Sequence, residues 1–255
     1  MSKTHEHEIA LRDLFSEIEE SHAFELTEHP HEIDNFEKVL GYKLPEDLKG
    51  FYRRYKTVQL FPYNGGWHYR FVPINEIHMT GLDIFGEDYD KDSVFSKEST
   101  YSWFTICDAM DGNYVAVDLE SGKDNQWNYI DCDHETYGIP GECKVIAKSF
   151  MEFMRQCLQN KETHFYLEKG FQGYGDALEI TSKTAIRRIH PVKPKWGWIG
   201  EIIRQMKYPQ IQSGWYVEFV KLNKSYNKFF SDKMYGSKEK AFEAADSYLE
   251  KTKDE

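Results

Sequence analysis

The chain has 255 residues, of which 40% are apolar and 16% aromatic, and its formal net charge is −11 at pH 7. Such a chain buries enough apolar surface to offset its ordering entropy, so the composition excludes a disordered protein. No apolar run is long enough for a membrane span, and the N-terminus lacks the layout of a secretory signal. The four cysteines form no CxxC pair and are too sparse for a disulfide framework. We expect a cytoplasmic protein with reduced thiols and no membrane partner.

Charge is distributed unevenly along the chain. Residues 1–164 hold 31 acidic and 16 basic residues, a net charge of −15, whereas residues 165–255 hold 12 and 16, a net charge of +4. Opposite signs in the two halves indicate different partners for them. Two solvated surfaces of one soluble protein would produce the same asymmetry, and charge alone does not separate the two interpretations.

The first 55 residues show the apolar periodicity of three amphipathic helices. The second ends at Gly41, and the third begins at Pro45, which suits the first turn of a helix. The apolar positions of the three helices are Ile9, Leu11, Leu14, Phe15 and Ile18, then Ile33, Phe36, Val39 and Leu40, then Leu48, Phe51, Tyr52 and Tyr55.

The period then shortens to that of strands. Short segments rich in aromatic and β-branched residues, separated by turn signals, lie at 67–74, 103–109, 111–121, 126–131 and 143–147. Helical spacing returns at 149–160. This order of helices, antiparallel strands and a further helix predicts an α+β fold.

A polar and then glycine-punctuated segment at 161–176 predicts a linker between two domains, 1–160 and 177–255. Strands are predicted at 184–192, 214–220 and 225–231, with an insertion at 191–213 and a final helix at 237–252. The second domain is therefore a small three-stranded sheet with one packed helix. Trp215, Val217 and Phe219 alternate and are expected in its core.

The search for reactive groups finds no enzyme signature. The early histidines lack zinc-ligand spacing, and "CDHE" at 132–135 is expected to be a surface turn. The glycines of "GFQGYG" match no phosphate or dinucleotide loop. We predict a protein that is not an enzyme and has no metal site and no cofactor.

Residues 81–93 carry five acids without the order of a calcium-binding loop. This segment is expected to be a solvated acidic loop or half of an interface that faces a basic partner. Its acids are Asp83, Glu87, Asp88, Asp90 and Asp92.

Residues 8–158 resemble the SUKH superfamily of Smi/Knr-type regulators and bacterial immunity proteins. The matching features, in the family's order, are "LGYKLPEDLKGFY", the Asn-Gly-Gly turn at 64–66, the strand leading into "NEI", the hairpin at Asp111-Gly112-Asn113 and the closing "SFMEFM" helix. The resemblance implies a non-enzymatic α+β fold, with helices around an antiparallel sheet, that in bacteria often binds and blocks a cognate toxin, frequently a nuclease.

Residues 184–250 resemble a bacterial version of the APETALA/ethylene-response-factor DNA-binding domain, in which a three-stranded sheet enters the major groove. Glu218 departs from this pattern, since arginine is common at its position, and the insertion at 191–213 is longer than usual. Edge-strand lysines that discourage aggregation explain the basic residues equally well. The residues that the resemblance places on matching strands are Arg187, Arg188, Tyr216, Lys221, Lys224 and Lys228.

Two functions compete. The first is an immunity-type protein whose acidic domain covers the surface of a cognate toxin, itself expected to be basic. The second is a DNA-binding regulator that uses the C-terminal sheet, with the SUKH-like domain as sensor or partner dock. Because Glu218 and the acidic N-terminal domain oppose an approach to phosphate, we expect DNA binding to be weak or absent.

Overall fold

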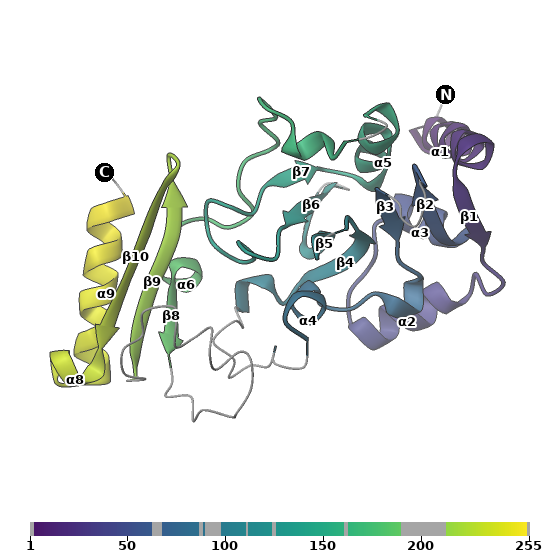
Figure 1. Cartoon of the computed structure of the whole chain (residues 1–255). Helices are drawn as coiled ribbons and strands as arrows, with labels where there is room; N and C mark the ends of the chain where they lie inside the picture. Colours follow the sequence, from purple (N-terminus) through teal and green to yellow (C-terminus); the bar gives the residue numbers. More distant parts are fainter. Residues whose placement is uncertain are drawn as a thin grey trace. The chain divides into compact units, whose positions relative to one another are not determined.

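The computed structural model describes residues 3–62, 68–86, 89, 98–110, 112–123, 126–160, 163–189 and 213–253. The chain divides into two compact units (Figure 1). Unit 1 comprises Met1–Tyr89, Thr100–Tyr137 and Cys143–Ala177, and unit 2 comprises Asp90–Ser99, Gly138–Glu142 and Leu178–Glu255. Both combine helices with antiparallel strands, which confirms the predicted α+β class.

Unit 1 contains a seven-stranded antiparallel sheet whose spatial order follows the chain, from β1 to β7. Consecutive strands pair as neighbours, so short connections suffice. The strands are β1 Ala23–Leu26, β2 Tyr55–Leu60, β3 Tyr69–Phe71, β4 Trp103–Asp108, β5 Tyr114–Lys123, β6 Gln126–Cys132 and β7 Val145–Ala147.

Helices α1, α2, α3 and α5 contribute side chains to the core on one face of this sheet. None of the described helices is long and apolar enough to cross a membrane. The helices of this part of the chain are α1 Lys3–Ser21, α2 Glu32–Leu40, α3 Glu46–Tyr52, α4 Thr80–Phe85 and α5 Phe150–Gln159, with three-residue 3-10 helices η1 Ile74–Glu76, η3 Glu98–Thr100 and η4 Phe165–Leu167.

Aromatic rings dominate the core of unit 1. The ring of Phe51 on α3 lies 4.9 Å from that of Phe150 on α5 and 5.4 Å from that of Phe71 on β3. All three side chains are fully buried. Tilted and edge-to-face pairs of this kind add stability beyond the area they bury.

One buried carboxylate joins two of these helices. Asp47 lies in the first turn of α3, and its Oδ2 accepts a hydrogen bond of 3.1 Å from the backbone N–H of Met151, in the first turn of α5. The first N–H groups of a helix have no partner within it, so the carboxylate satisfies a group that burial would otherwise leave unpaired.

Unit 2 contains the predicted small sheet, in the order β10-β9-β8, with α9 packed on one face. Val217 and Phe219 are fully buried, and the Trp215 ring lies 4.8 Å from that of Phe242 on α9, as the alternating pattern predicted. The elements are α6 Ser182–Ala185, β8 Ile186–Ile189, β9 Gly214–Lys221, β10 Lys224–Ser231, α8 Asp232–Tyr235 and α9 Lys238–Lys253. The insertion at 191–213 lies, except for Ser213, outside the described residues.

Two predictions in the first 60 residues were wrong, and one strand was missed. Tyr55 does not belong to the third helix but begins β2, where it is fully buried. Strand β1 was not predicted, because its four residues are too few to give a clear alternating signal. Val39 is 78% exposed instead of buried, so the buried stripe of α2 is narrower than its sequence indicated.

Residues 163–177, most of the segment predicted to be a linker, lie in unit 1. Phe165 and Tyr166 are buried in its core, and Gly175 accepts a backbone hydrogen bond of 2.9 Å from Val145 on β7. The glycines therefore serve backbone turns beside a strand. The proposed domain limits at 160 and 177 stay a prediction for proteolysis to test.

Candidate partner-binding surfaces

Of the five acids predicted to bind a partner, Asp83 lies within the described residues, and Glu87, Asp88, Asp90 and Asp92 lie outside them. Asp83 was predicted to lie on a loop, but it lies on helix α4. Six helical residues between Met79 and Gly86 are too few to give a periodic signal in the sequence. The surroundings of Asp83 form the acidic site, defined here as His78, Asp83, Asp108 and Tyr114.

Helix α4 is fixed to the sheet next to this site. The backbone N–H of Thr105 on β4 donates to the carbonyl of His78 at 3.1 Å, and Met79 forms an isolated bridge with Phe104. Gly81 is required because a Cβ atom there would lie 2.2 Å from the ring of Tyr89. A short helix is thereby held by its backbone against β4, which sets the position of Asp83.

His78 bridges the helix and the turn before it. Its Nε2 lies 2.6 Å from Oδ1 of Asp83, and its Nδ1 lies 2.6 Å from the carbonyl oxygen of Glu76. Nδ1 must be protonated to donate to a carbonyl. The contact with Asp83 requires a second proton, carried either by Nε2 or by the carboxyl group.

The second carboxylate oxygen of Asp83, Oδ2, is buried and accepts no hydrogen bond from the described residues. Burial raises the pKa of Asp83, while Thr105 and His78 act in the opposite direction and Asp108 adds repulsion. Burial also raises the pKa of Tyr114, with further contributions from Asp83 and Asp108. The site thus places two carboxylates, those of Asp83 and Asp108, close enough to repel each other, and a cation beside them would reduce this repulsion.

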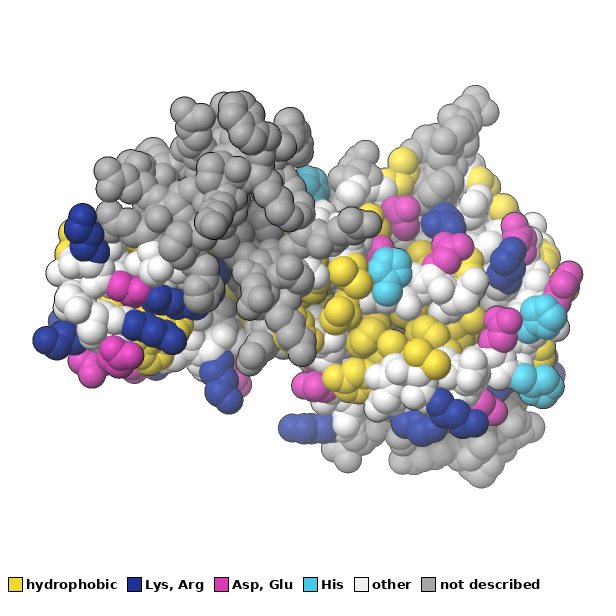
Figure 2. Space-filling model, turned by 90° about the horizontal axis from the view of Figure 1, so that it is seen from below, with side chains coloured by type: hydrophobic (Ala, Val, Ile, Leu, Met, Phe, Trp, Pro, Cys, Tyr) yellow, Lys and Arg dark blue, Asp and Glu magenta, His cyan; other side chains and the backbone are white. Residues whose placement is uncertain are grey.

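The residues near the acidic site carry both positive and negative charges. Arg70 on β3 is the cross-strand partner of Asp108, and its Nη2 lies 3.1 Å from Oε2 of Glu76. On the face that Figure 2 shows, acidic, basic and histidine side chains of unit 1 are likewise interspersed. The acidic site is therefore a local feature and not part of a uniform negative field.

Sequence reasoning found Asp83 but missed His78, Asp108 and Tyr114. Asp108 and Tyr114 are cross-strand partners that flank the predicted hairpin at 111–113, so their pairing could have been read from the turn. Their proximity to Asp83 depends on how α4 docks, and no local pattern encodes that. No group of three or more His, Cys, Asp or Glu side chains among the described residues could hold a metal ion.

The cysteines have no role in this site. All four are buried, and none of them forms a disulfide. Burial raises the pKa of Cys107, Cys132 and Cys157, so these thiols stay neutral and are poor nucleophiles. The absence of an enzymatic activity stays a prediction.

The residues predicted to contact nucleic acid lie on both faces of the sheet in unit 2. Because paired residues of antiparallel strands share a face, the buried pair Val217 and Ile186 marks the side of α9. Arg187 and Tyr216 lie on the other face, which we call the helix-free face. The remaining four lie on the helix side, namely Arg188, Lys221, Lys224 and Lys228.

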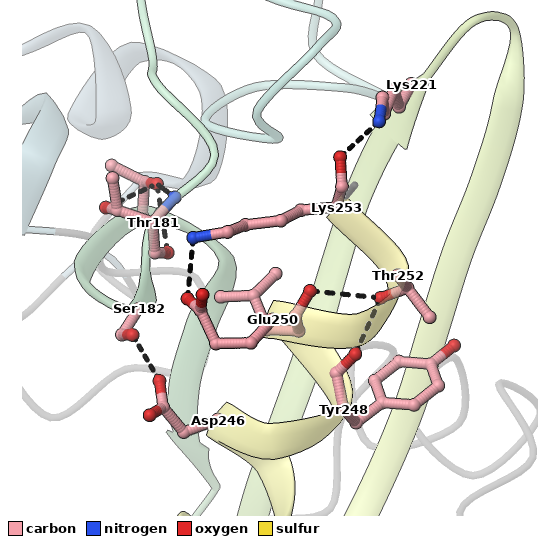
Figure 3. Close-up of polar contacts among 10 residues, drawn as sticks. Thr181, Ser182, Lys221, Asp246, Tyr248, Glu250, Thr252 and Lys253 are labelled. Carbon is pink, nitrogen blue, oxygen red and sulfur yellow. Dashed lines mark hydrogen bonds and ion pairs between the residues drawn. The ribbon is translucent and has the colours of Figure 1, made fainter. Parts of the chain in front are cut away.

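The basic groups on the helix side contact unit 2 itself. Arg188 forms a bidentate pair with Asp232, at 2.7 and 2.5 Å, and Nζ of Lys228 lies 4.9 Å from the centre of the Tyr248 ring. Lys221 donates to the backbone carbonyl of Lys253 near the C-terminal end of α9 (Figure 3). A cation there satisfies an otherwise unpaired carbonyl and complements the helix dipole. These contacts account for the basic residues without a nucleic-acid partner.

On the helix-free face, Arg187 is matched by a carboxylate. Its Nη2 lies 3.2 Å from Oε2 of Glu218, and its guanidinium lies 5.1 Å from the centre of the Tyr216 ring. A phosphate would have to compete with Glu218 for this guanidinium. The face that would enter a groove thus has one described arginine opposed by one glutamate.

Comparison with known proteins matches about half of the chain. Residues 29–156 match the model of the SMI1 / KNR4 family (SUKH-1). The chain is also 29% identical, over 139 residues, to the immunity protein YokJ of Bacillus subtilis (strain 168). The aligned residues cover 54% of this chain and 79% of YokJ.

Proposed function

Because the chain belongs to the SMI1 / KNR4 family (SUKH-1), we propose that it is an immunity-type protein that binds and neutralises a cognate toxin. The observation that carries this proposal is the similarity to an immunity protein over 79% of that protein's length. Immunity of this kind needs a stoichiometric complex and no chemistry by the binder.

The acidic site supplies a contact for such a partner. The carboxylates of Asp83 and Asp108 lie close enough to repel each other. A lysine or arginine of the toxin placed beside the acidic site would reduce this repulsion. A nuclease suits this contact, because its substrate surface must itself be basic to bind phosphate. Complementary charge would also increase the association rate.

Co-expression tests the proposal. The protein encoded next to this chain's gene is produced in a bacterial host with and without the chain, and growth is measured. We expect growth only when both are present, and a complex of equal stoichiometry on purification. A neighbouring product that is harmless alone, or a toxic one that the chain neither binds nor neutralises, would contradict the proposal.

The described residues of unit 2 do not favour the DNA-binding alternative. Four of the five predicted basic residues lie on the helix side of the sheet, and the fifth is paired with Glu218. We therefore retain weak or absent DNA binding as the expectation.

A further inference from the structure

The two edges of the seven-stranded sheet differ in whether further backbone pairs with them. At one edge, residues 173–177 pair with β7 and the residues before it: Tyr174 donates to the carbonyl of Val145 at 2.8 Å, and Lys144 and Asp176 form a bridge. At the other edge, β1 pairs with β2 and with no other strand of the described part of the chain. In Figure 1, β1 is the outermost strand of the sheet. An open edge is a template for one more strand.

Strand β1 also exposes apolar side chains. All four of its residues are exposed, including Phe24 at 38% and Leu26 at 56%. Phe24 is the cross-strand partner of Val58, which is fully buried, so both lie on the core side of the sheet. Leu26, two residues further along the strand, lies on the same side and pairs with the buried Tyr55 across a shift in register. The Phe24 ring packs edge-on against Tyr55 at 5.7 Å, and Phe24 and Leu26 keep part of their apolar surface exposed at the open edge.

Charge around β1 selects the kind of strand that can dock. Glu25 holds Lys56 at 2.9 Å, and the carboxylates of Glu25, Glu76 and Glu28 together raise the pKa of that lysine. Because Glu76 is also paired with Arg70, these three carboxylates face two cationic groups, which leaves an excess of one negative charge. A second copy of the chain would bring the same carboxylates against each other, whereas a segment with lysine or arginine would be attracted.

We propose that β1 receives an extended, basic segment of the cognate toxin as an eighth strand of the sheet. Main-chain hydrogen bonds along β1 would give affinity, and the alternating side chains of the segment would cover Phe24 and Leu26. This inference rests on the proposed function. Strand β1 lies outside residues 29–156, so the docking edge is not part of the region matched by the family model.

The test uses Leu26→Lys, which places a charge in the apolar contact and repels a basic segment. Leu167→Lys is the matched control, because Leu167 is a similarly exposed leucine (64%) of unit 1 that lies on η4. Affinity for the purified toxin encoded next to this chain's gene is measured by calorimetry, with thermal melts to check folding. We expect Leu26→Lys to weaken binding at least tenfold, Leu167→Lys to change it less than twofold, and both variants to melt like the wild type.

Hydrogen exchange gives an independent readout on the unmodified chain. Amides of residues 23–26 are expected to exchange at least tenfold more slowly in the complex. Normal binding by Leu26→Lys, with unchanged exchange in β1, would overturn the docking edge and leave the proposed function intact. A wild-type chain that does not bind the toxin would overturn both. A wild-type dimer that Leu26→Lys converts to a monomer would assign the edge to a second copy and overturn the proposal.

Discussion

Arg187 and Glu218 form an ion pair on the helix-free face of unit 2, with 3.2 Å between Nη2 and Oε2. The glutamate is the residue at which the sequence departed from the expected DNA-binding pattern. The pair leaves these two residues without net charge, and the Tyr216 ring holds the guanidinium from one side. Half-buried pairs of this type resist competition by an external anion, because a phosphate must first displace the carboxylate.

We predict that the full-length chain binds duplex DNA no more tightly than roughly 1 µM at physiological salt, which is the range of non-specific contacts. Glu218→Gln should strengthen binding several-fold by releasing Arg187, and Arg187→Gln should abolish that gain. Fluorescence anisotropy with a labelled duplex library measures all three proteins. Nanomolar, sequence-selective binding by the wild type would favour the regulator instead of the immunity protein.

The acidic site provides a second prediction. Replacing Asp83 by asparagine removes one of the two carboxylates of the acidic site, and a contact with a charged group contributes about 1.5–3 kcal/mol. We expect Asp83→Asn to weaken toxin binding by roughly tenfold or more, in calorimetry at neutral pH. Asp34→Asn, an exposed acid on α2, is the control and should bind like the wild type. Equal affinities of the two variants for the toxin would show that the toxin contacts a surface other than α4.

The sequence predicted those elements of the fold that are determined by interactions between residues close together in the chain. It did not predict those that depend on contacts between distant residues. Val217 and Phe219 were assigned to a core because their alternation is visible within one strand. Tyr55 was assigned to a helix because its spacing from Phe51 and Tyr52 fits one, and only its pairing with Leu26 of β1 makes it a strand residue. Local spacing cannot report that competition.

The same distinction applies to the candidate sites. Asp83 was found because acids cluster in the sequence, whereas His78 and Asp108 join it through the docking of α4 on β4. The lysines of the C-terminal hairpin were correctly placed on strands. Whether they lie on the helix side or on the helix-free face of the sheet depends on where α9 packs. Lys221, for example, contacts the end of a helix 32 residues further along the chain.

The turn between β9 and β10 carries conformational strain. Leu222 and Asn223 have φ values of 51° and 60°, and Leu222 is 86% exposed. Two positive φ values define the hairpin turn that asparagine and glycine favour, and a leucine there costs about 1–2 kcal/mol. We predict that Leu222→Asn raises the free energy of unfolding of unit 2 by roughly 0.5–1 kcal/mol.

Thermal and denaturant unfolding followed by tryptophan fluorescence, to which Trp215 of unit 2 contributes, would detect this gain. Leu167→Asn is the control: it removes an exposed leucine from a 3-10 helix with no positive φ, and it should not stabilise the chain. A loss of stability in Leu222→Asn would show that the leucine makes a contact that its exposure does not reveal.

Asp131 on β6 gives the protein a distinctive dependence on pH. Burial raises its pKa to about 7, Asp133 adds repulsion, and Lys144 acts in the opposite direction. Its folded pKa lies above the unfolded value of about 3.9, so the folded state holds this proton more tightly. The associated stability is fully present below pH 4 and is lost as pH rises towards 7.

Asp131→Asn mimics the protonated carboxyl at every pH. The free energy of unfolding of this variant, minus that of the wild type, should therefore increase by about 2–4 kcal/mol between pH 4 and pH 7.5, and then level off. Glu135→Gln, at an exposed neighbouring acid, is the matched control variant. Urea titrations at intervals of half a pH unit measure both. A flat difference for Asp131→Asn would mean that the carboxylate is already ionised at its ordinary pKa and that solvent reaches it in the folded state.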